Sequence, residues 1–357
     1  MTDTTSGLVC GHHHLYSALA RGMPAPPKTP TNFLEILQQV WWRVDAVLDL
    51  EMLHWSAMLG AVEALMSGTT AIVDHHESPN AIEGSLSVIA DACAAVGLRV
   101  VASYGVTDRW NDDGSPYDGS WPPPSTTVAA RHGLAECDRF LRAGGRGMVG
   151  LHAAFTCADE TLEAAADLAR GLGVGVHVHV SEDRIDVGAG ARLQSLARDD
   201  WLLVHCVHLD RPLSGTIAHN SRSNMNNAVG YAHPTARPNP IVLGSDGIGA
   251  DMFEELRLTY ARLREDEVTA TPDTVWSWLE EGYSFVPEAR DDRVRWNYDH
   301  ADSPWHVAFT PGMRALDVTI DGEVVLRDGA PTRVDLSEVR AKAAEQATRL
   351  FAALDDL

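Results

Sequence analysis

Lysine is almost absent from this chain of 357 residues: Lys28 and Lys342 are its only two, so arginine carries nearly all of the positive charge. Acidic residues outnumber basic ones, 50 to 28, and the formal net charge is −22. Nucleic-acid partners require basic patches. The charge balance therefore excludes binding to a phosphate backbone and indicates an acidic, solvated surface instead.

Cysteine and long apolar runs are also scarce. The five cysteines are scattered, odd in number and form no Cys-x-x-Cys pair, which is typical of reduced thiols rather than of a disulfide framework. No stretch approaches the roughly 18 consecutive apolar residues of a transmembrane helix, and no basic segment precedes an apolar one at the N-terminus. We expect a cytoplasmic protein without membrane or nucleic-acid partners.

Apolar runs with strand character alternate with helical patterns along most of the chain. Such an alternation is typical of a buried parallel sheet, and eight strands predict a (β/α)8 TIM barrel. An open doubly wound sheet is the alternative, but no Gly-x-Gly-x-x-Gly motif opens a helix. The expected strands are Leu8–Gly11, Thr69–Asp74, Leu98–Gly105, Met148–His152, Val174–His179, Trp201–Cys206, Thr216–His219 and Ile241–Ser245. The expected helices between the early strands are Phe33–Val47 with Met52–Met66, Ala81–Val96, Thr126–Leu141 and Glu160–Leu172.

Two connections are too short for a regular barrel. Only Leu209–Ser214 separates the sixth expected strand from the seventh, although parallel neighbours need a crossover of roughly a dozen residues. The proline-rich passage from Gly230 to Ile241 is also short for a loop and a full helix. Either the barrel has shortened crossovers here, or connecting segments are missing from the chain.

The pattern changes after Arg264. A helix is expected over Thr271–Tyr283, a hairpin with an Asp-Gly turn over Ala315–Asp328 and an amphipathic helix over Leu336–Leu354. We predict a hydrolase-type barrel over residues 7–310. Residues 311–357 would add a β-hairpin and a C-terminal helix as the remnant of a small β-domain.

Histidines and carboxylates gather where the expected strands end, which in a barrel is one rim. A single histidine at such a place is most often a satisfied core or loop residue, but histidines at five strand ends favour a metal site. They occur in the segments His12–His14, Asp74–Glu77, at His152, in His177–Glu182 and in His205–His208, and Ser245–Gly247 adds an aspartate.

Strand alternation selects among these residues. His12 and His14 would project to one side and share a metal, whereas His13 would point away and tolerate substitution. A strand-five histidine and Asp246 would complete a mixed nitrogen and oxygen set that suits Zn²⁺, with Fe²⁺ as the alternative. His179 is favoured over His177 because it lies nearest the strand end.

Two further residues are candidates for catalysis. Glu182, three residues after His179, would move a proton from the activated water to a substrate nitrogen. His205 would polarise a substrate carbonyl or orient the water. The competing interpretations are an exposed loop acid for Glu182 and an ordinary buried histidine for His205.

A resemblance follows from the order of these motifs. The segments "GLVCGHHHLYSALARG", "HVSED", "HCVHLD" and "LGSDGIGADM" resemble the signatures of the amidohydrolase superfamily. The segments "FLEILQQVWWRVD", "DHHESPNAIEGSL", "HAAFTCADETLE" and "HNSRSNMNNAVGYA" are similar, more narrowly, to SsnA-type aminohydrolases. The resemblance runs from about Gly7 to the C-terminal hairpin.

The resemblance implies one divalent metal per chain in the barrel mouth. Its ligands would be His12, His14, His179 and Asp246, with Asp246 also acting as a base. Glu182 would be the proton shuttle and His205 would assist the water or the substrate. Binuclear relatives bridge two metals with a lysine from strand four, but that strand ends here in His152, so a single metal is expected. A homodimer is also implied.

Four residues are weaker candidates for contacts with a substrate: His152, Glu77, Arg109 and Asn224, with Asn226 as the alternative to Asn224. His152 competes with a simple filler of the barrel mouth, and Asn224 with a plain polar turn. Trp41 and Trp42 are interpreted as core rather than as a stacking platform.

The sequence thus predicts a metal-dependent aminohydrolase that deaminates a small nitrogen heterocycle of the purine, pyrimidine or triazine type. Hydrolysis of a C–Cl, alkylamino or amide C–N bond at the same site is the alternative. A non-catalytic barrel that has lost activity is the third interpretation, and the complete set of candidate ligands argues against it.

Overall fold

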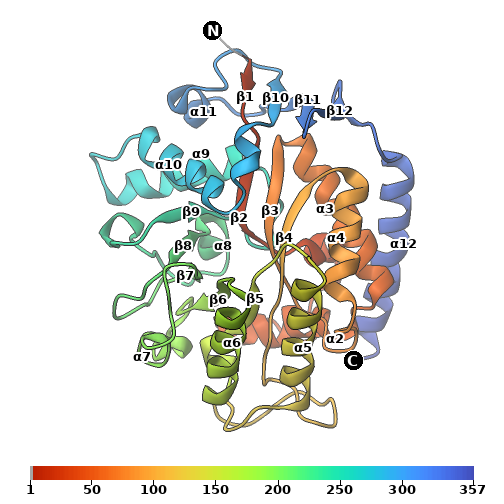
Figure 1. Cartoon of the computed structure of the whole chain (residues 1–357), viewed down its shortest axis with the longest axis vertical. Coiled ribbons are helices and arrows are strands. Elements are labelled where there is room, and N and C mark those ends of the chain that lie inside the picture. The colour runs from red at the N-terminus through yellow and green to blue at the C-terminus, as the bar shows by residue number, and fades with distance from the viewer. Residues whose placement is uncertain (1–2) are drawn as a thin grey trace.

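The computed structural model describes residues 3–357, in which eight parallel strands form a closed barrel (Figure 1). Three strands pair in the order β2-β3-β4 and five in the order β5-β6-β7-β8-β9. Parallel bridges Ala102↔Gly147 and Val106↔Leu151 join β4 to β5, and His13↔Asp246 joins β9 back to β2. The predicted barrel is confirmed, and each of its eight expected strands is present.

The strands of the barrel end at the same rim, which carries the candidate site. Their bounds are β2 Leu8–His13, β3 Thr69–His76, β4 Arg99–Tyr104, β5 Val149–Ala153, β6 Val176–Val180, β7 Leu202–His205, β8 Thr216–His219 and β9 Ile241–Leu243.

Helices surround the barrel and include those expected from the sequence. They are α1 Phe33–Ile36, α2 Trp42–Val47, α3 Leu50–Met66, α4 Ser85–Val96, α5 Val128–Arg142, α6 Asp159–Leu172, α7 Ala189–Leu193, α8 Ser221–Asn226, α9 Met252–Asp266, α10 Pro272–Glu280, α11 Pro304–Phe309 and α12 Leu336–Asp355. A π-helical turn, η2 Leu37–Trp41, joins α1 to α2. The 3₁₀ turns are η1 Leu15–Ala20, η3 Ala154–Thr156, η4 Arg184–Asp186, η5 Pro234–Ala236, η6 Glu281–Ser284 and η7 Pro287–Arg290. No helix in this described part is long and apolar enough to span a bilayer.

The barrel interior is apolar toward the N-terminal ends of the strands. Small and branched side chains from six strands pack there with Val286 and Ala289, which come from the segment around η7. The strand residues are Val9, Ala71, Val73, Val101, Leu202, Val204, Ala218 and Val242, joined by Met148. This core supports the polar layer above it, so the site rests on a rigid base.

The short connections expected from the sequence are present. The ten residues between β7 and β8 form a loop without a helix, although the two strands pair in parallel with Leu202 opposite Thr216. Between α8 and β9 there is only the single turn η5. The barrel is therefore abbreviated on this side.

A second sheet covers the opposite end of the barrel and has the order β1-β10-β11-β12-β13. Its strands are β1 Thr4–Thr5, β10 Arg293–Trp296, β11 Ala315–Ile320, β12 Glu323–Arg327 and β13 Ala330–Pro331. The expected hairpin is β11 with β12. The predicted barrel domain of residues 7–310 includes β10, whereas β10 pairs in this small sheet with β11 and with β1, which precedes residue 7.

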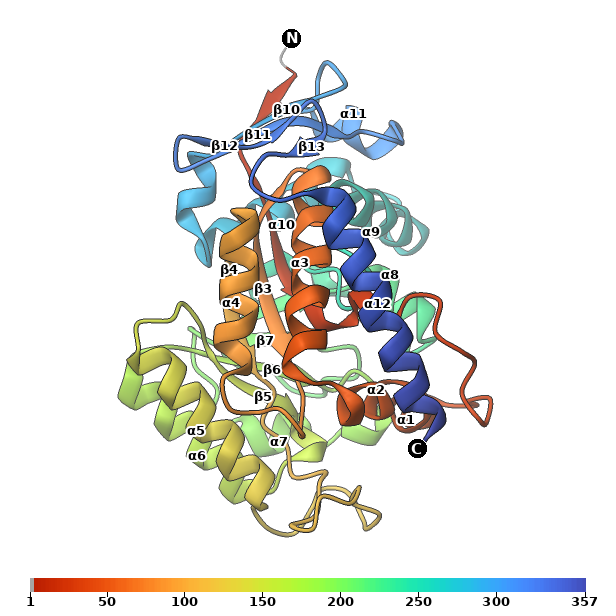
Figure 2. The ribbon, with the colours of Figure 1, turned by 90° about the vertical axis from the view of Figure 1, so that its right-hand side faces the viewer.

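The C-terminal helix α12 returns from the small sheet along the barrel wall beside α3 (Figure 2). Its buried Ala343, Leu350 and Leu354 pack in a cluster with Leu48 and Leu53. This packing ties the C-terminal segment to the helix layer that follows the first barrel strand.

Candidate metal centre

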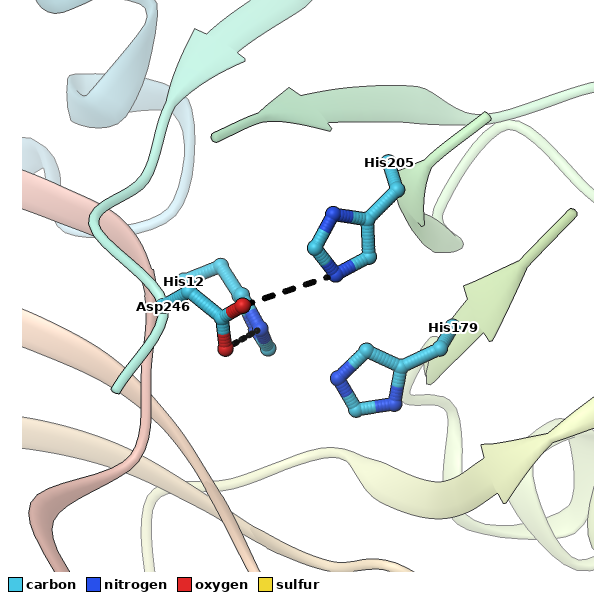
Figure 3. Close-up of side chains that lie close together, drawn as sticks. All are labelled: His12, His179, His205 and Asp246. Atoms are coloured by element: carbon cyan, nitrogen blue, oxygen red, sulfur yellow. Dashed lines mark ion pairs between the residues drawn. The ribbon is translucent and has the colours of Figure 1, made fainter. Parts of the chain in front are cut away.

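Four ligand-type side chains converge at the rim: His12 from β2, His179 from β6, His205 from β7 and Asp246 from the segment after β9 (Figure 3). One donor atom from each lies within 4.8 Å of all the others. His12 Nε2 is 3.5 Å from Asp246 Oδ1, and His205 Nε2 is 3.8 Å from Asp246 Oδ2. The convergence brings together residues that lie up to 234 positions apart in the sequence.

His14 lies beside this cluster and contacts it directly. Its Nε2 is 2.9 Å from Asp246 Oδ1 and 3.3 Å from His179 Nε2. His14 also forms a second possible ligand group with His75 and His179. The structure thus brings together all four predicted ligands, and it places His205 as near to Asp246 as a fifth ligand would be.

His75 was not among the predicted site residues, although it lines the pocket beside His14 and His179. Two positions earlier on β3, Val73 packs inside the barrel. Strict alternation from Val73 would have directed His75 inward as well.

Backbone irregularities, rather than regular strand alternation, direct three of these side chains toward the centre: those of His12, His205 and Asp246. The register of β2 shifts between Cys10 and His13, and the shift lets His12 face the same centre as His14. His205 and Asp246 have positive φ angles of 69° and 55°, a left-handed conformation that non-glycine residues adopt at a cost. Such conformations concentrate at functional sites, because the surrounding structure must hold them in place.

The hydrogen bonds at the far side of each ring leave Nε2 directed at the centre. His14 Nδ1 donates to the carbonyl of His75, at 2.7 Å, and His179 Nδ1 to the carbonyl of His152. His205 Nδ1 donates to Asn224 Oδ1 at 2.8 Å. Because a neutral imidazole with its proton on Nδ1 has its lone pair on Nε2, each ring presents a ligand atom.

The donor set fits a divalent cation. The buried Nε2 atoms of His12 and His205 have no hydrogen-bond partner within the protein, although buried polar atoms are normally paired. Imidazole nitrogens and one carboxylate make a mixed site that suits Zn²⁺ or a similar transition metal.

Burial and charge set the protonation of the centre. Burial lowers the pKa of His179 to about 3 and that of His12 well below its usual range, so both are neutral ligands at pH 7. Burial raises the pKa of Asp246, but its interactions with the facing imidazoles of His12, His14 and His205 outweigh burial and hold that pKa well below the usual value. Asp246 is therefore an anion in a group of imidazoles.

Glu182 lies next to the cluster and points toward it. Its Oε2 is 3.3 Å from His205 Nε2, and its Oε1 accepts a hydrogen bond from Asn227 Nδ2 at 3.4 Å. Burial and the charge of Asp246 raise the pKa of Glu182 well above the usual range. Glu182 is thus a half-buried acid, its side chain 12% exposed, that can hold a proton at neutral pH, not the exposed loop acid of the competing interpretation.

Above the cluster opens a pocket lined by side chains of the rim and of the segment from His14 to Asp45. One wall is aromatic, with Trp41, Trp42 and Phe155, and another is acidic, with Asp45 and Glu77. Trp42 is buried in a core cluster and Trp41 packs against another, as expected from the sequence, and both side chains also line this pocket. His152, a predicted contact, lines it as well.

Two predicted substrate contacts lie behind the pocket wall. Arg109 is 1% exposed and pairs with Asp45 at 2.5 Å and with Glu77, while its guanidinium lies over Trp42. Asn224 is 2% exposed and bonded to His205. Neither side chain lines the pocket, so both act on it through the residues they hold.

His13 points away from the cluster, as alternation predicts, but the tolerance expected of it does not follow. Its side chain is 3% exposed, and its Nδ1 lies 3.0 Å from Ser245 Oγ, next to the segment that carries Asp246. Substitution would leave a buried partner unsatisfied and disturb a neighbour of the site.

The amidohydrolase family model matches residues 4–280, more than three quarters of the chain. The chain belongs to the amidohydrolase family. The match includes each of the strands that carry the cluster, so the resemblance noted in the sequence motifs is confirmed.

Relatives within the family are deaminases. The 5′-deoxyadenosine deaminase of Methanopyrus kandleri is 27% identical and aligns over 96% of this chain and 86% of its own length. The 8-oxoguanine deaminase of Pseudomonas aeruginosa is 27% identical over 97% of this chain and 87% of its own. Their class confirms the expectation of a hydrolase that acts on carbon–nitrogen bonds.

A solved structure shows the same fold. An adenosine deaminase from Xanthomonas campestris, crystallised with bound zinc, superposes with a TM-score of 0.80 at 21% identity. The match covers 97% of this chain and 85% of the deaminase. The abbreviated barrel described above therefore keeps the architecture of a family member that holds a metal.

Proposed function

We propose that this protein is a metal-dependent aminohydrolase that removes an exocyclic amine from a purine-type heterocycle and releases ammonia. One observation carries the proposal. Four ligand-type side chains converge at the rim, His14 contacts two of them, and the half-buried acid Glu182 lies against His205. The relatives that deaminate 5′-deoxyadenosine and 8-oxoguanine support a purine over a pyrimidine or triazine.

The residues would divide the work as follows. His12, His14, His179 and Asp246 would hold one Zn²⁺ ion, which when bound supplies Lewis acidity to activate water. Glu182, with its raised pKa, holds a proton at Oε2 and delivers it to the leaving nitrogen. Asp246 is ionised before the reaction and accepts a proton during it. His205, whose orientation is fixed by Asn224, faces both acids and orients the attacked group.

The pocket wall offers hydrogen-bond acceptors to the substrate. Thr156 Oγ1 donates to a backbone carbonyl, so it accepts from His152 Nδ1 at 2.7 Å and leaves the lone pair of His152 on Nε2. That atom lies 3.7 Å from Glu77 Oε1, which has no hydrogen-bond partner. Two neighbouring acceptors fit a substrate that presents N–H or O–H donors, with its flat ring beside the tryptophans.

The proposal is tested by metal analysis and an ammonia assay on the purified protein. We expect about one zinc ion per chain and ammonia release from at least one aminated purine or purine nucleoside. The panel should contain 5′-deoxyadenosine, adenosine, guanine and 8-oxoguanine, with chlorinated and alkylamino heterocycles as comparison substrates. Bound metal with release of chloride or an alkylamine, and no ammonia from any amine, would contradict deamination and favour the alternative hydrolysis.

The charge of the pocket predicts that phosphorylated substrates are rejected. Six acidic side chains line it, and no arginine or lysine of the described residues does; besides the proton carrier Glu182 they are Asp45, Glu77, Asp183, Asp186 and Asp246. A phosphate dianion near these acids costs several kcal/mol, so kcat/KM for AMP should be at least about 100-fold below that for adenosine. The two compounds differ only in the phosphate, and equal turnover of both would contradict the prediction.

A further inference from the structure

His12 differs from the other histidines of the cluster in the group that its far nitrogen contacts. The Nδ1 atoms of His14 and His179 face backbone carbonyls, and that of His205 faces an amide oxygen. These three oxygens can only accept a hydrogen bond, and the second neighbour of His205 Nδ1, Asn220 Nδ2, is farther away at 3.5 Å. His12 Nδ1 instead lies 2.8 Å from Nε2 of another histidine, His177, which could donate or accept.

Ser103 on β4 removes this ambiguity. Its hydroxyl donates its single hydrogen to the carbonyl of Asp74 at 2.8 Å. Toward His177 Nδ1, 3.1 Å away, the same oxygen is therefore an acceptor, and His177 must carry its proton on Nδ1. The lone pair of a neutral His177 then lies on Nε2. It accepts the proton of His12 Nδ1, and the lone pair of His12 lies on Nε2, which faces Asp246.

The hydrogen-bonded side chains of Ser103, His177 and His12 lie in the interior, where an unpaired polar group is costly. His12, His177 and Ser103 are each 0% exposed, and His177 on β6 pairs in register with Leu202 of the apolar layer inside the barrel. A buried imidazole is tolerated there only when its nitrogens are paired, and here both are. Because the His177 ring is 0% exposed, burial favours its neutral form.

We propose that His177 and Ser103 form a hydrogen-bonded chain that fixes His12 in the tautomer with its lone pair directed at the metal. His177 is a positioning residue: it lies beneath the site, does not line the pocket and acts through His12. The inference rests on the ligand role proposed for His12. It assigns a role to the first histidine of the "HVH" segment, which strand alternation alone places on the same face as His179.

The experiment compares two substitutions at His177 by zinc affinity, measured by competition with a chelator. His177→Leu removes the acceptor for His12 Nδ1, and we expect zinc to bind about 10–100-fold more weakly. His177→Gln keeps an acceptor oxygen at similar reach, so its affinity should stay within about threefold of the unmodified protein. His76→Leu is the matched control, since His76 is equally buried but bonds Ser78 away from the cluster.

A second measurement does not depend on how the variants fold. Long-range ¹H–¹⁵N correlation spectra of the metal-free protein report which nitrogen of each histidine is protonated, and we expect Nδ1 for both His12 and His177.

A further variant, Ser103→Ala, should release His177 from this tautomer and weaken zinc binding in the same direction as His177→Leu.

Three results would overturn the inference. They are a proton on Nε2 of His12, unchanged zinc affinity in His177→Leu, or equal weakening by His177→Leu and His177→Gln. Chelator competition requires no substrate, so a failure to release ammonia would reject the proposed reaction without altering this result.

Discussion

Glu182→Gln is expected to lower kcat for ammonia release by about 10²–10⁴-fold while the protein keeps its metal. The carboxyl lies 3.3 Å from His205 Nε2, and burial together with the charge of Asp246 raises its pKa well above the usual range. It can therefore hold the proton that a leaving amine requires. Glutamine has nearly the same shape and still accepts from Asn227, but it cannot transfer a proton.

Steady-state kinetics and metal content, measured on the same preparation, check this prediction. Asp183→Asn is the matched control, because Asp183 is the adjacent residue and also lines the pocket but makes no contact with His205. We expect its kcat to remain within about threefold of the unmodified protein. Activity in Glu182→Gln equal to that of the control variant would reject Glu182 as the proton carrier and revive the interpretation of an inactive or differently operating barrel.

The barrel could be predicted because its signal is local and repeated. Apolar runs such as Val176–Val180 and Leu202–His205 fit strands buried on both faces, and parallel strands must end at one rim. Histidines and acids at those ends therefore had to meet. This geometric constraint, rather than any single residue, placed His179, Glu182 and Asp246 together before their distances were known.

Alternation did not suffice where the backbone departs from a regular strand. His205 follows Val204, which packs inside the barrel, so a period of two would have turned His205 outward. The left-handed conformations of His205 and Asp246 return both side chains to the centre. A non-glycine residue in that conformation depends on tertiary contacts, such as the hydrogen bond that His205 Nδ1 donates to Asn224 Oδ1. A sequence pattern does not encode such a contact.

Contacts between residues far apart in the sequence were not predicted from the sequence, for a related reason. β1 pairs with β10 across about 290 residues, with Thr5 opposite Val294, and two-residue strands such as β1 carry too little pattern to be recognised. Arg109 was a candidate for substrate contact because it is a charged residue after a strand. Its partners Asp45 and Glu77 come from two other segments and draw it into the wall behind the pocket.

His14→Ala and His205→Ala are expected to separate the metal ligands from the residue that assists the reaction. His14 Nε2 lies 2.9 Å from Asp246 Oδ1 and 3.3 Å from His179 Nε2, between two other ligands. His205 Nε2 lies closer to Glu182 than to Asp246, at 3.3 Å against 3.8 Å, and so stands on the side of the proton carrier. We expect His14→Ala to lose more than about 100-fold in zinc affinity, beyond the effect of an outer partner.

His205→Ala should retain about one zinc ion per chain and lose about 10²–10⁴-fold in kcat, because removing this ring leaves Glu182 without the imidazole that it faces. Metal analysis after dialysis, chelator competition and the ammonia assay measure the three quantities on each variant. The four side chains His12, His179, His205 and Asp246 form a compact group by distance alone. If His205→Ala lost the metal and His14→Ala kept it, that group would be the ligand set. His14 would then be a neighbour of the centre, held by the carbonyl of His75 and the charge of Asp246.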